Sequence, residues 1–292
     1  MLKTRVIAAL LVRNGIVVQS VGFKQFLPIG RPSVCIEFLS RWGVDEIVVL
    51  DIGATLQGRA VGKEFIDEVS RECFLPISTG GGFREIAEIE AAVLAGSEKV
   101  VINSAALEEA SIIDRSAALF GTQCVVASID AKKTVDWESG EASWRVYGHC
   151  GRTETQRHPA EWAKELVDRG AGEILINSID RDGSGDGYDL ALIEQVVRAV
   201  DVPVIALGGV GRAQDFVDGI LIGGATAVAA GNIFHHTEHA VVLAKEALSR
   251  AGINLRRVAD AEYGETVLDW AGRVTLASHD SEQTERAAGP CI

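Results

Sequence analysis

The chain has 292 residues, of which 47% are hydrophobic and 24% are charged, and its formal net charge is −13. These values are typical of one soluble domain with a large core, and the acidic balance argues against nucleic acid or an anionic membrane as a partner. The five cysteines are scattered without a CxxC pair, which favours reduced thiols in the cytoplasm over a zinc site or disulfides. The sequence predicts no metal and no cofactor.

Short apolar runs alternate with longer amphipathic runs along most of the chain. The amphipathic runs predict helices, and most of them end in glycine, which tolerates the left-handed position after a helix. The apolar run in MLKTRVIAALLV resembles a signal peptide, but it is short and lacks a cleavage site, so we expect a strand there. The expected strands lie near 5–11, 46–51, 75–79, 99–103, 123–130, 173–178, 203–207 and 226–230.

The two halves of the chain repeat one pattern. EIVVLDIGAT begins at Glu46 and is echoed by EILINSIDRD from Glu173, whereas LPISTGGG ends at Gly82 and is echoed by VPVIALGG ending at Gly209. In both pairs the echo comes 127 positions later, which indicates a duplicated (βα)₄ half. Eight parallel strands ringed by helices close a barrel, so we predict a single α/β domain, a (β/α)₈ TIM barrel, over residues 1–256.

Two connections and the end of the chain depart from this pattern. The connections at 12–30 and 131–157 are too long for plain turns, and each leaves the carboxyl end of the first strand of a half, where barrel active sites are built. The second is rich in Trp, Ser, Gly and Thr, and we interpret it as a cover over the substrate. Residues 257–292 form an expected C-terminal appendage, whose last fifteen or so residues we predict to be disordered.

Glycines after the third and seventh expected strands indicate two phosphate sites. Gly80–Gly82 and Gly208–Gly209 each precede a helix, where glycine allows the backbone N–H groups to approach an anion. Asn103-Ser104 and Gly231-Asn232 follow the neighbouring strands. Two such sites on opposite sides of the mouth suit a substrate with a phosphate at each end, although the glycines could instead only make tight turns.

Acidic residues at strand ends supply candidate proton-transfer groups. Asp130 ends the fifth strand, and a carboxylate at that rim acts as a general acid or base when burial tunes its pKa. Asp51, Asp180 and Asp182 lie on the same rim, and for Asp51 and Asp180 an alternative role is to brace loops by hydrogen bonds to the backbone. The duplication predicts a partner for Asp130 at the end of the first strand, but Leu11 stands there, and leucine cannot move a proton.

Several stretches resemble the cyclase subunit of imidazole glycerol phosphate synthase (HisF) and its paralogs. They are RVIA, VVLDI, TGGGFRE, KVVINSAAL, VVASIDAK, GAGEILINSIDRDGSGDGYD, GGVG and GNIFH, and the resemblance covers residues 1 to about 256. It implies a (β/α)₈ barrel with a HisH-like glutaminase at its amino-terminal face. Ammonia would pass through the barrel to a doubly phosphorylated ribulosyl substrate at the other face.

The resemblance assigns roles to individual positions. A ring of charges at the amino-terminal face, the ammonia gate, falls on Arg5, Glu46, Lys99 and Glu173. The phosphate-binding positions fall on Gly82, Asn103, Ser104, Gly183, Gly209, Gly231 and Asn232. All of these residue types match the family pattern.

The catalytic positions match only in part. One family aspartate falls on Asp130, whereas the other falls on Leu11 and the lysine of the mobile first loop falls on Gln19. Leu207 and Asn177 replace small hydroxyl residues. Loss of one member of an acid–base pair typically costs about 10²–10⁴-fold in rate.

Three functions remain open. The departures at the catalytic face favour a paralog that delivers ammonia from a glutaminase to a sugar amidotransferase, for acetamidino groups of surface polysaccharide. The alternative is a divergent cyclase of histidine biosynthesis, which makes imidazole glycerol phosphate and an aminoimidazole carboxamide ribotide. A second alternative is a non-catalytic barrel that binds a phosphorylated sugar.

Overall fold

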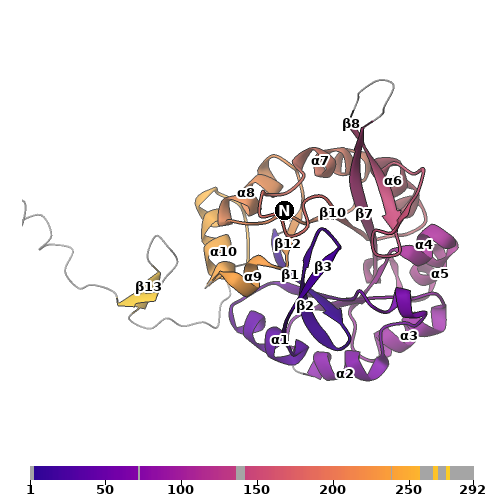
Figure 1. Ribbon diagram of the computed structural model, residues 1–292, viewed down its shortest axis with the longest axis horizontal. Coiled ribbons are helices and arrows are strands. Elements are labelled where there is room, and N and C mark those ends of the chain that lie inside the picture. Colours follow the sequence, from indigo (N-terminus) through magenta and orange to yellow (C-terminus); the bar gives the residue numbers. More distant parts are fainter. Residues whose placement is uncertain are drawn as a thin grey trace, which may run out of the picture.

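The computed structural model describes residues 3–71, 73–135, 142–237 and 239–256, together with 266–268 and 274–276. Within this part of the chain, eight parallel strands form a closed barrel, and helices surround it (Figure 1). The barrel strands are β1 (Arg5–Arg13), β4 (Glu46–Asp51), β5 (Ile77–Gly80), β6 (Lys99–Ile102), β7 (Val125–Val135), β10 (Glu173–Ser178), β11 (Val204–Leu207) and β12 (Ala227–Ala230). The predicted (β/α)₈ TIM barrel is confirmed.

Parallel pairing closes the barrel at two points that join its halves. β12 pairs with β1 from Arg5↔Ala227, and β6 pairs with β7 from Val100↔Val125. Side chains alternate between the two faces of a strand, so every second residue faces the lumen. The carboxyl ends of all eight barrel strands therefore meet at one rim, which we call the mouth.

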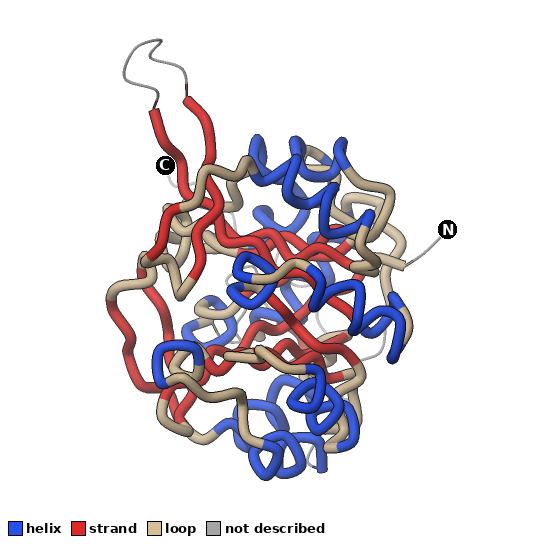
Figure 2. Tube along the Cα trace, turned by 90° about the vertical axis from the view of Figure 1, so that its right-hand side faces the viewer, coloured by secondary structure: helices blue, strands red, loops and turns tan. Residues whose placement is uncertain are grey.

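The helices return the chain to the amino-terminal end of each strand (Figure 2). They are α1 (Pro32–Arg41), α2 (Lys63–Arg71), α3 (Ile86–Leu94), α4 (Ser104–Glu108), α5 (Ser111–Phe120), α6 (Pro159–Asp168), α7 (Leu190–Ala199), α8 (Ala213–Leu221), α9 (Ile233–His236) and α10 (Ala240–Arg250). Proline begins α1 and α6, where its missing N–H costs no hydrogen bond. Among the described helices, none is long and apolar enough to cross a membrane.

The core has two layers. The larger cluster lies between the strands and the helices, and it includes the fully buried Trp162 and Phe216. The smaller cluster fills the lumen and consists of Ile7, Val48, Val101, Val126, Leu175, Ile205, Ala227 and Ala229. The barrel is therefore a packed apolar interior between two polar ends.

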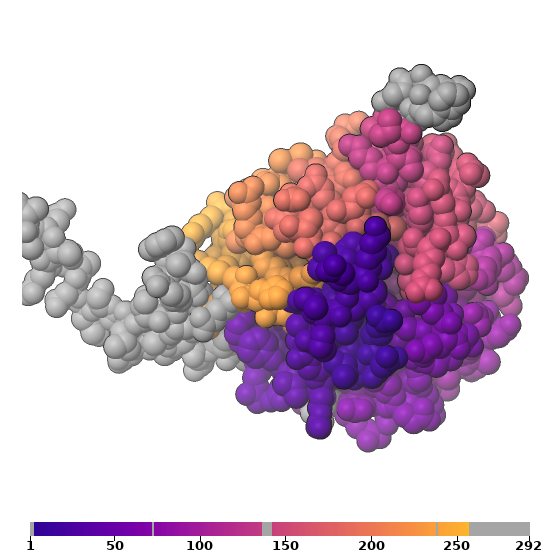
Figure 3. All heavy atoms as spheres, in the orientation of Figure 1, coloured from indigo at the N-terminus to yellow at the C-terminus, as the bar shows by residue number. Residues whose placement is uncertain are grey.

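Both long connections contain strands that the sequence analysis did not predict. β1 extends to Arg13 and turns through Asn14 and Gly15, both at positive φ, into β2 (Ile16–Val21) and β3 (Gln25–Gly30). This hairpin of β2 and β3, in indigo, lies over the centre of the molecule in the space-filling view (Figure 3). β7 continues past its expected end at 130 and pairs with β8 (Ala142–Gly148), which pairs with β9 (Thr153–Glu154).

The predicted appendage lies largely outside the described residues. Within it the structure describes β13 (Thr266–Leu268) and β14 (Val274–Leu276), which pair antiparallel. The expectation of disorder over the last fifteen or so residues falls outside the described part. A bridge between Thr4 and Leu255 joins the two ends of the barrel domain, and its boundary at 256 remains our proposal.

Candidate functional site

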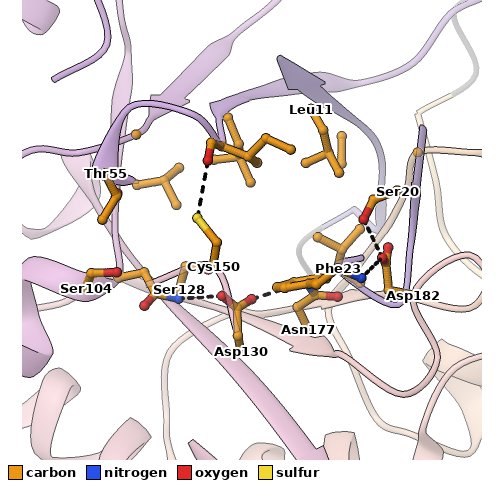
Figure 4. A pocket seen from close by; sticks show the side chains of 18 of the residues that line it. Leu11, Ser20, Phe23, Thr55, Ser104, Ser128, Asp130, Cys150, Asn177 and Asp182 are labelled. Carbon is orange, nitrogen blue, oxygen red and sulfur yellow. Dashed lines mark hydrogen bonds between the residues drawn. The ribbon is translucent and has the colours of Figure 1, made fainter. Parts of the chain in front are cut away.

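One pocket at the mouth gathers most of the predicted site residues. Its lining includes both glycine-rich loops, Asp130 and Leu11 (Figure 4). Every predicted phosphate-binding residue lines it: Gly82, Asn103, Ser104, Gly183, Gly209, Gly231 and Asn232. Asp182 also lines the pocket, whereas Asp51 and Asp180 do not. Tertiary structure thus brings both halves of the duplication to one cavity.

The first glycine-rich loop follows β5. Gly81 and Gly82 adopt φ of +134° and +67°, conformations that side chains rarely adopt. Ser104, at the start of α4, accepts a hydrogen bond from the backbone N–H of His149 through Oγ at 3.0 Å. Arg84 follows the loop and also lines the pocket, so this side of the mouth presents a cation and backbone donors to an anion.

The second glycine-rich loop follows β11. Gly208 and Gly209 adopt φ of +96° and +104°. Asn232, after β12, donates from Nδ2 to the carbonyl oxygen of Ser20 at 2.8 Å and so ties the β2–β3 hairpin to this side. Gly183 packs against the backbone of Ser20, a contact that a Cβ at this position would prevent. Close backbone packing therefore explains why glycine is needed here.

Asp130 lies at the floor of the pocket between two amides. Asn103 Nδ2 donates to its Oδ2 at 2.9 Å, and Asn177 Nδ2 donates to its Oδ1 at 3.2 Å. Burial raises the pKa of Asp130 to about 7, the two amide hydrogen bonds lower it, and the charge of Asp182 adds a smaller rise. A carboxyl group with this pKa exchanges protons near neutral pH, as a general acid or base must.

Leu11 faces the pocket across from Asp130 (Figure 4). It lies on β1 between Ala9 and Arg13, which also line the pocket, and it pairs in register with Val18 of β2 and Leu50 of β4. An aliphatic side chain therefore stands where the family resemblance places the second aspartate. Gln19, at the loop-lysine position, is buried, and its side chain lies against the imidazole of His236.

The other rim acids hold loops in place. Asp182 accepts hydrogen bonds from Ser20 Oγ at 2.6 Å and from the backbone N–H of Phe23 at 3.1 Å. Its pKa is raised, chiefly by burial. Asp51 binds Arg59 at 2.7 Å, so it too is occupied within its own loop.

Asp180 also holds a neighbouring segment in place. It accepts a hydrogen bond from the backbone N–H of Lys133, on the extension of β7, at 2.7 Å. Asp130 is thus the rim carboxylate whose hydrogen bonds come from two side-chain amides at the pocket floor, whereas the others accept from an arginine, a serine or the backbone of a loop.

The sequence analysis missed several pocket residues. Arg13, Arg84 and Arg152 bring positive charge to the mouth. Cys150 donates from Sγ to the carbonyl oxygen of Ile52 at 3.2 Å, and burial raises its pKa to about 11, so it is a protonated thiol at neutral pH. Arg84 could have been found from its place directly after the glycine-rich loop, but no local signal indicates Arg152 or Cys150. Among the described residues, no cluster of three or more His, Cys, Asp or Glu side chains could hold a metal ion.

The four predicted ring residues meet at the amino-terminal end of the lumen. Arg5 Nη1 lies 2.7 Å from Glu46 and 3.1 Å from Glu173, and Lys99 Nζ lies 2.9 Å and 3.2 Å from the same two carboxylates. Ser78 Oγ also donates to Glu46 at 2.9 Å. Each carboxylate therefore contacts both cations, so the charges of the ring compensate one another at this end of the lumen.

These features define a (β/α)₈ barrel with a ring of ion pairs at one end and, at the other, two glycine-rich loops beside a buried acid held by two amides. The chain matches the family model "Histidine biosynthesis protein" over residues 5–240. It therefore belongs to the histidine biosynthesis protein family, in which it is a HisF-like barrel.

Three relatives are similar over nearly their whole length. A Vibrio vulnificus protein, provisionally named imidazole glycerol phosphate synthase subunit hisF2, is 38% identical over 94% of this chain and 98% of its own. The imidazole glycerol phosphate synthase subunit HisF of Hyphomonas neptunium is 42% identical over 88% of this chain and 100% of its own. The corresponding subunit of Caulobacter vibrioides is also 42% identical, over 88% and 97%.

Proposed function

We propose that this chain is a cyclase-type barrel subunit of imidazole glycerol phosphate synthase. It uses ammonia to convert a doubly phosphorylated ribulosyl compound to imidazole glycerol phosphate and an aminoimidazole carboxamide ribotide. The observation that carries the proposal is one pocket holding both glycine-rich loops with Asp130 between them. The names of the two HisF relatives at 42% identity support it.

The test is turnover of the ribulosyl substrate by the purified chain with an ammonium salt at high pH, where free ammonia is plentiful. We expect slow but measurable formation of both products, because Asp130 remains and its partner position is Leu11. If the chain binds the substrate but forms no products, the result would instead support a non-catalytic barrel that binds a phosphorylated sugar. Absence of both binding and products would reject the proposal.

We also propose that a HisH-like glutaminase docks on the amino-terminal face and releases ammonia at the charged ring. Large apolar side chains are exposed around this face, at helix ends and in the loops that lead into the strands. They include Phe74, which is 95% exposed, and Leu94, which is 77% exposed. Exposed apolar surface of this kind is typical of protein–protein interfaces.

A single substitution tests this interface. Phe74→Asp places a charge in the proposed contact and should weaken glutaminase binding at least tenfold, as hot-spot changes do. Turnover with added ammonium should stay unchanged, since Phe74 lies far from the mouth. Leu27→Asp on β3, a residue 53% exposed at the opposite end of the barrel, is the matched control for binding. Equal binding by wild type and Phe74→Asp would reject this docking face.

Leu11 supports a second candidate function. A mouth in which an aliphatic side chain lies across from Asp130 suits a barrel that passes ammonia to another acceptor, such as the N-acetyl group of a nucleotide sugar held by a sugar amidotransferase. In that case the chain should bind glutaminase normally but should not convert the ribulosyl substrate, even with saturating ammonia. Adding the amidotransferase and its sugar should then yield an acetamidino product.

A further inference from the structure

The wall of the pocket continues onto the hairpin of β7 and β8. On β7, every second residue from Val126 faces the lumen, and Ser128 and Asp130 of this row line the pocket. β7 runs on to Val135, so Lys132 is the next residue of the same row, about 7 Å beyond Asp130. The two strands extend past the ring of helices (Figure 1). The hairpin therefore presents Lys132 on the face that leads into the mouth.

Two cations lie directly opposite each other on this face. Lys132 pairs in register with Arg145 of β8. Opposite residues of an antiparallel pair point to the same side with Cβ atoms about 4.5–5.5 Å apart, and like charges in this arrangement are destabilising. Lys132 and Arg145 are half-buried, whereas Ala131 and Val146 on the other face are fully buried in the core. A ligand in solution can therefore reach both cations.

Neither cation makes an ion pair with a carboxylate in the part of the chain that the structure describes. Arg145 instead donates from Nη1 to a ring nitrogen of His158 at 2.7 Å. Glu154 and Asp180, which bond to residues of this hairpin, accept from a tyrosine hydroxyl at 2.6 Å and a backbone N–H at 2.7 Å. Two facing cations without an acid break a local rule of sheet pairing, which is typical of a binding site.

We propose that Lys132 and Arg145 form an outer phosphate site, which binds a phosphate group of the substrate before the two glycine-rich loops hold it. A phosphate dianion matches this pair, because lysine supplies a point charge and arginine supplies a fork of N–H donors. The chain as a whole carries a net charge of −13 and repels a doubly phosphorylated molecule, so a local cationic site at the entrance raises the rate of productive encounter. The identity of the substrate rests on the proposed function.

Lys132→Gln tests the site, with Lys133→Gln as the matched control. Both variants lose one positive charge, but Lys133 lies on the opposite face of β7, where its Nζ is 5.8 Å from the centre of the Trp144 ring. At low salt the kcat/KM for the ribulosyl substrate should fall about three- to tenfold in Lys132→Gln and less than about twofold in Lys133→Gln, with kcat unchanged in both. The loss should vanish near 1 M salt, where the Debye length is about 3 Å. Equal losses in the two variants would overturn the inference, because net charge alone would explain them.

The facing cations also predict a change in stability. Without an anion, Lys132→Gln removes a repulsion and should raise the melting temperature by about 1–3 °C. Inorganic phosphate should then raise the melting temperature of the wild type more than that of the variant, since a ligand stabilises the state that binds it. A lower melting temperature for Lys132→Gln would overturn the inference, because it would show that Lys132 stabilises the fold.

Binding can be observed without turnover. In NMR spectra of the wild type, the side-chain Nε–Hε signal of Arg145 should shift when inorganic phosphate replaces chloride at constant ionic strength. The signal of Arg198, which pairs with Glu194 on α7, is the control and should not shift. A shift at Arg145 in a chain that forms no products would support the site and reject only the proposed function. No shift at Arg145, or an equal shift in Lys132→Gln, would overturn the inference even if the chain is an active cyclase.

Discussion

The two ends of the barrel differ in whether their charged side chains form ion pairs. At the amino-terminal end, each of two cations lies within 3.2 Å of both carboxylates in a closed set of ion pairs. At the mouth, Asp130 receives only amide hydrogen bonds, and Leu11 occupies the place across the pocket. The same fold thus holds one set of charges fully compensated and leaves another carboxyl group uncompensated, with a raised pKa.

This difference in charge compensation predicts different roles for the two ends of the barrel. A compensated ring keeps its geometry whatever reaction occurs above it, whereas the mouth depends on one titratable group. The comparison therefore predicts that changes at the mouth alter rate, and that changes at the ring alter stability.

Asp130→Asn should have the largest effect. It keeps the shape of the side chain but removes the carboxylate that two amides hold at the pocket floor, so turnover with ammonium should fall about 10²–10⁴-fold. Steady-state formation of imidazole glycerol phosphate measures this loss. Asp180→Asn is the control, because Asp180 binds the backbone of Lys133 and lies outside the pocket lining. Equal losses in both variants would show that the mouth does not depend on Asp130 in particular.

Glu46→Gln should mainly affect folding. Glu46 is buried and binds both Arg5 and Lys99, so its neutralisation leaves two cations with one carboxylate. The free energy of unfolding, measured with urea, should fall by about 3–5 kcal/mol. Glu37→Gln breaks an exposed helical pair with Arg41 and should cost less than about 1 kcal/mol. Similar losses of unfolding free energy in Glu46→Gln and Glu37→Gln would contradict the account of the ring as a set of mutually compensated charges.

Leu11→Asp should raise turnover with ammonium, but only by about tenfold, well short of the full effect of a catalytic acid. Full recovery is not expected because Gln19, buried against His236, still stands at the position of the family's loop lysine. Leu11→Asn is the matched control, since it is polar but does not titrate. If the single change matched the double variant Leu11→Asp, Gln19→Lys, the residue at position 19 would have no part in the reaction.

Much of the fold could be predicted because the signal is local and repeated. Alternating apolar and amphipathic runs placed all eight barrel strands, and the shared offset of the two halves indicated closure. The turn from β1 into β2 was missed although Asn14-Gly15, which forms it, is a strong hairpin signal. The extension of β7 was missed because its residues beyond Asp130 are polar and exposed on one face, so apolar periodicity ends there.

The site could be predicted only as far as individual strand ends. The glycine-rich loops and Asp130 could be predicted because they directly follow expected strands, at the end of a barrel where active sites are built. The contact between Asp182 and Ser20 joins residues 162 positions apart and has no local signal. The same holds for the pairing of Asn177 with Asp130, which depends on the register between β10 and β7.

The pH dependence of turnover tests the central claim, that one carboxyl group governs the mouth. Free ammonia is held constant while pH varies from about 6 to 9, and the wild type is compared with Asp130→Asn. Because Asp130 must be ionised to accept a proton and its pKa is about 7, the wild-type rate should rise through one ionisation near pH 7 and then level off. The rate of Asp130→Asn should be low and should lack this rise. A wild-type profile with no ionisation near pH 7, or the same rise in Asp130→Asn, would contradict the account.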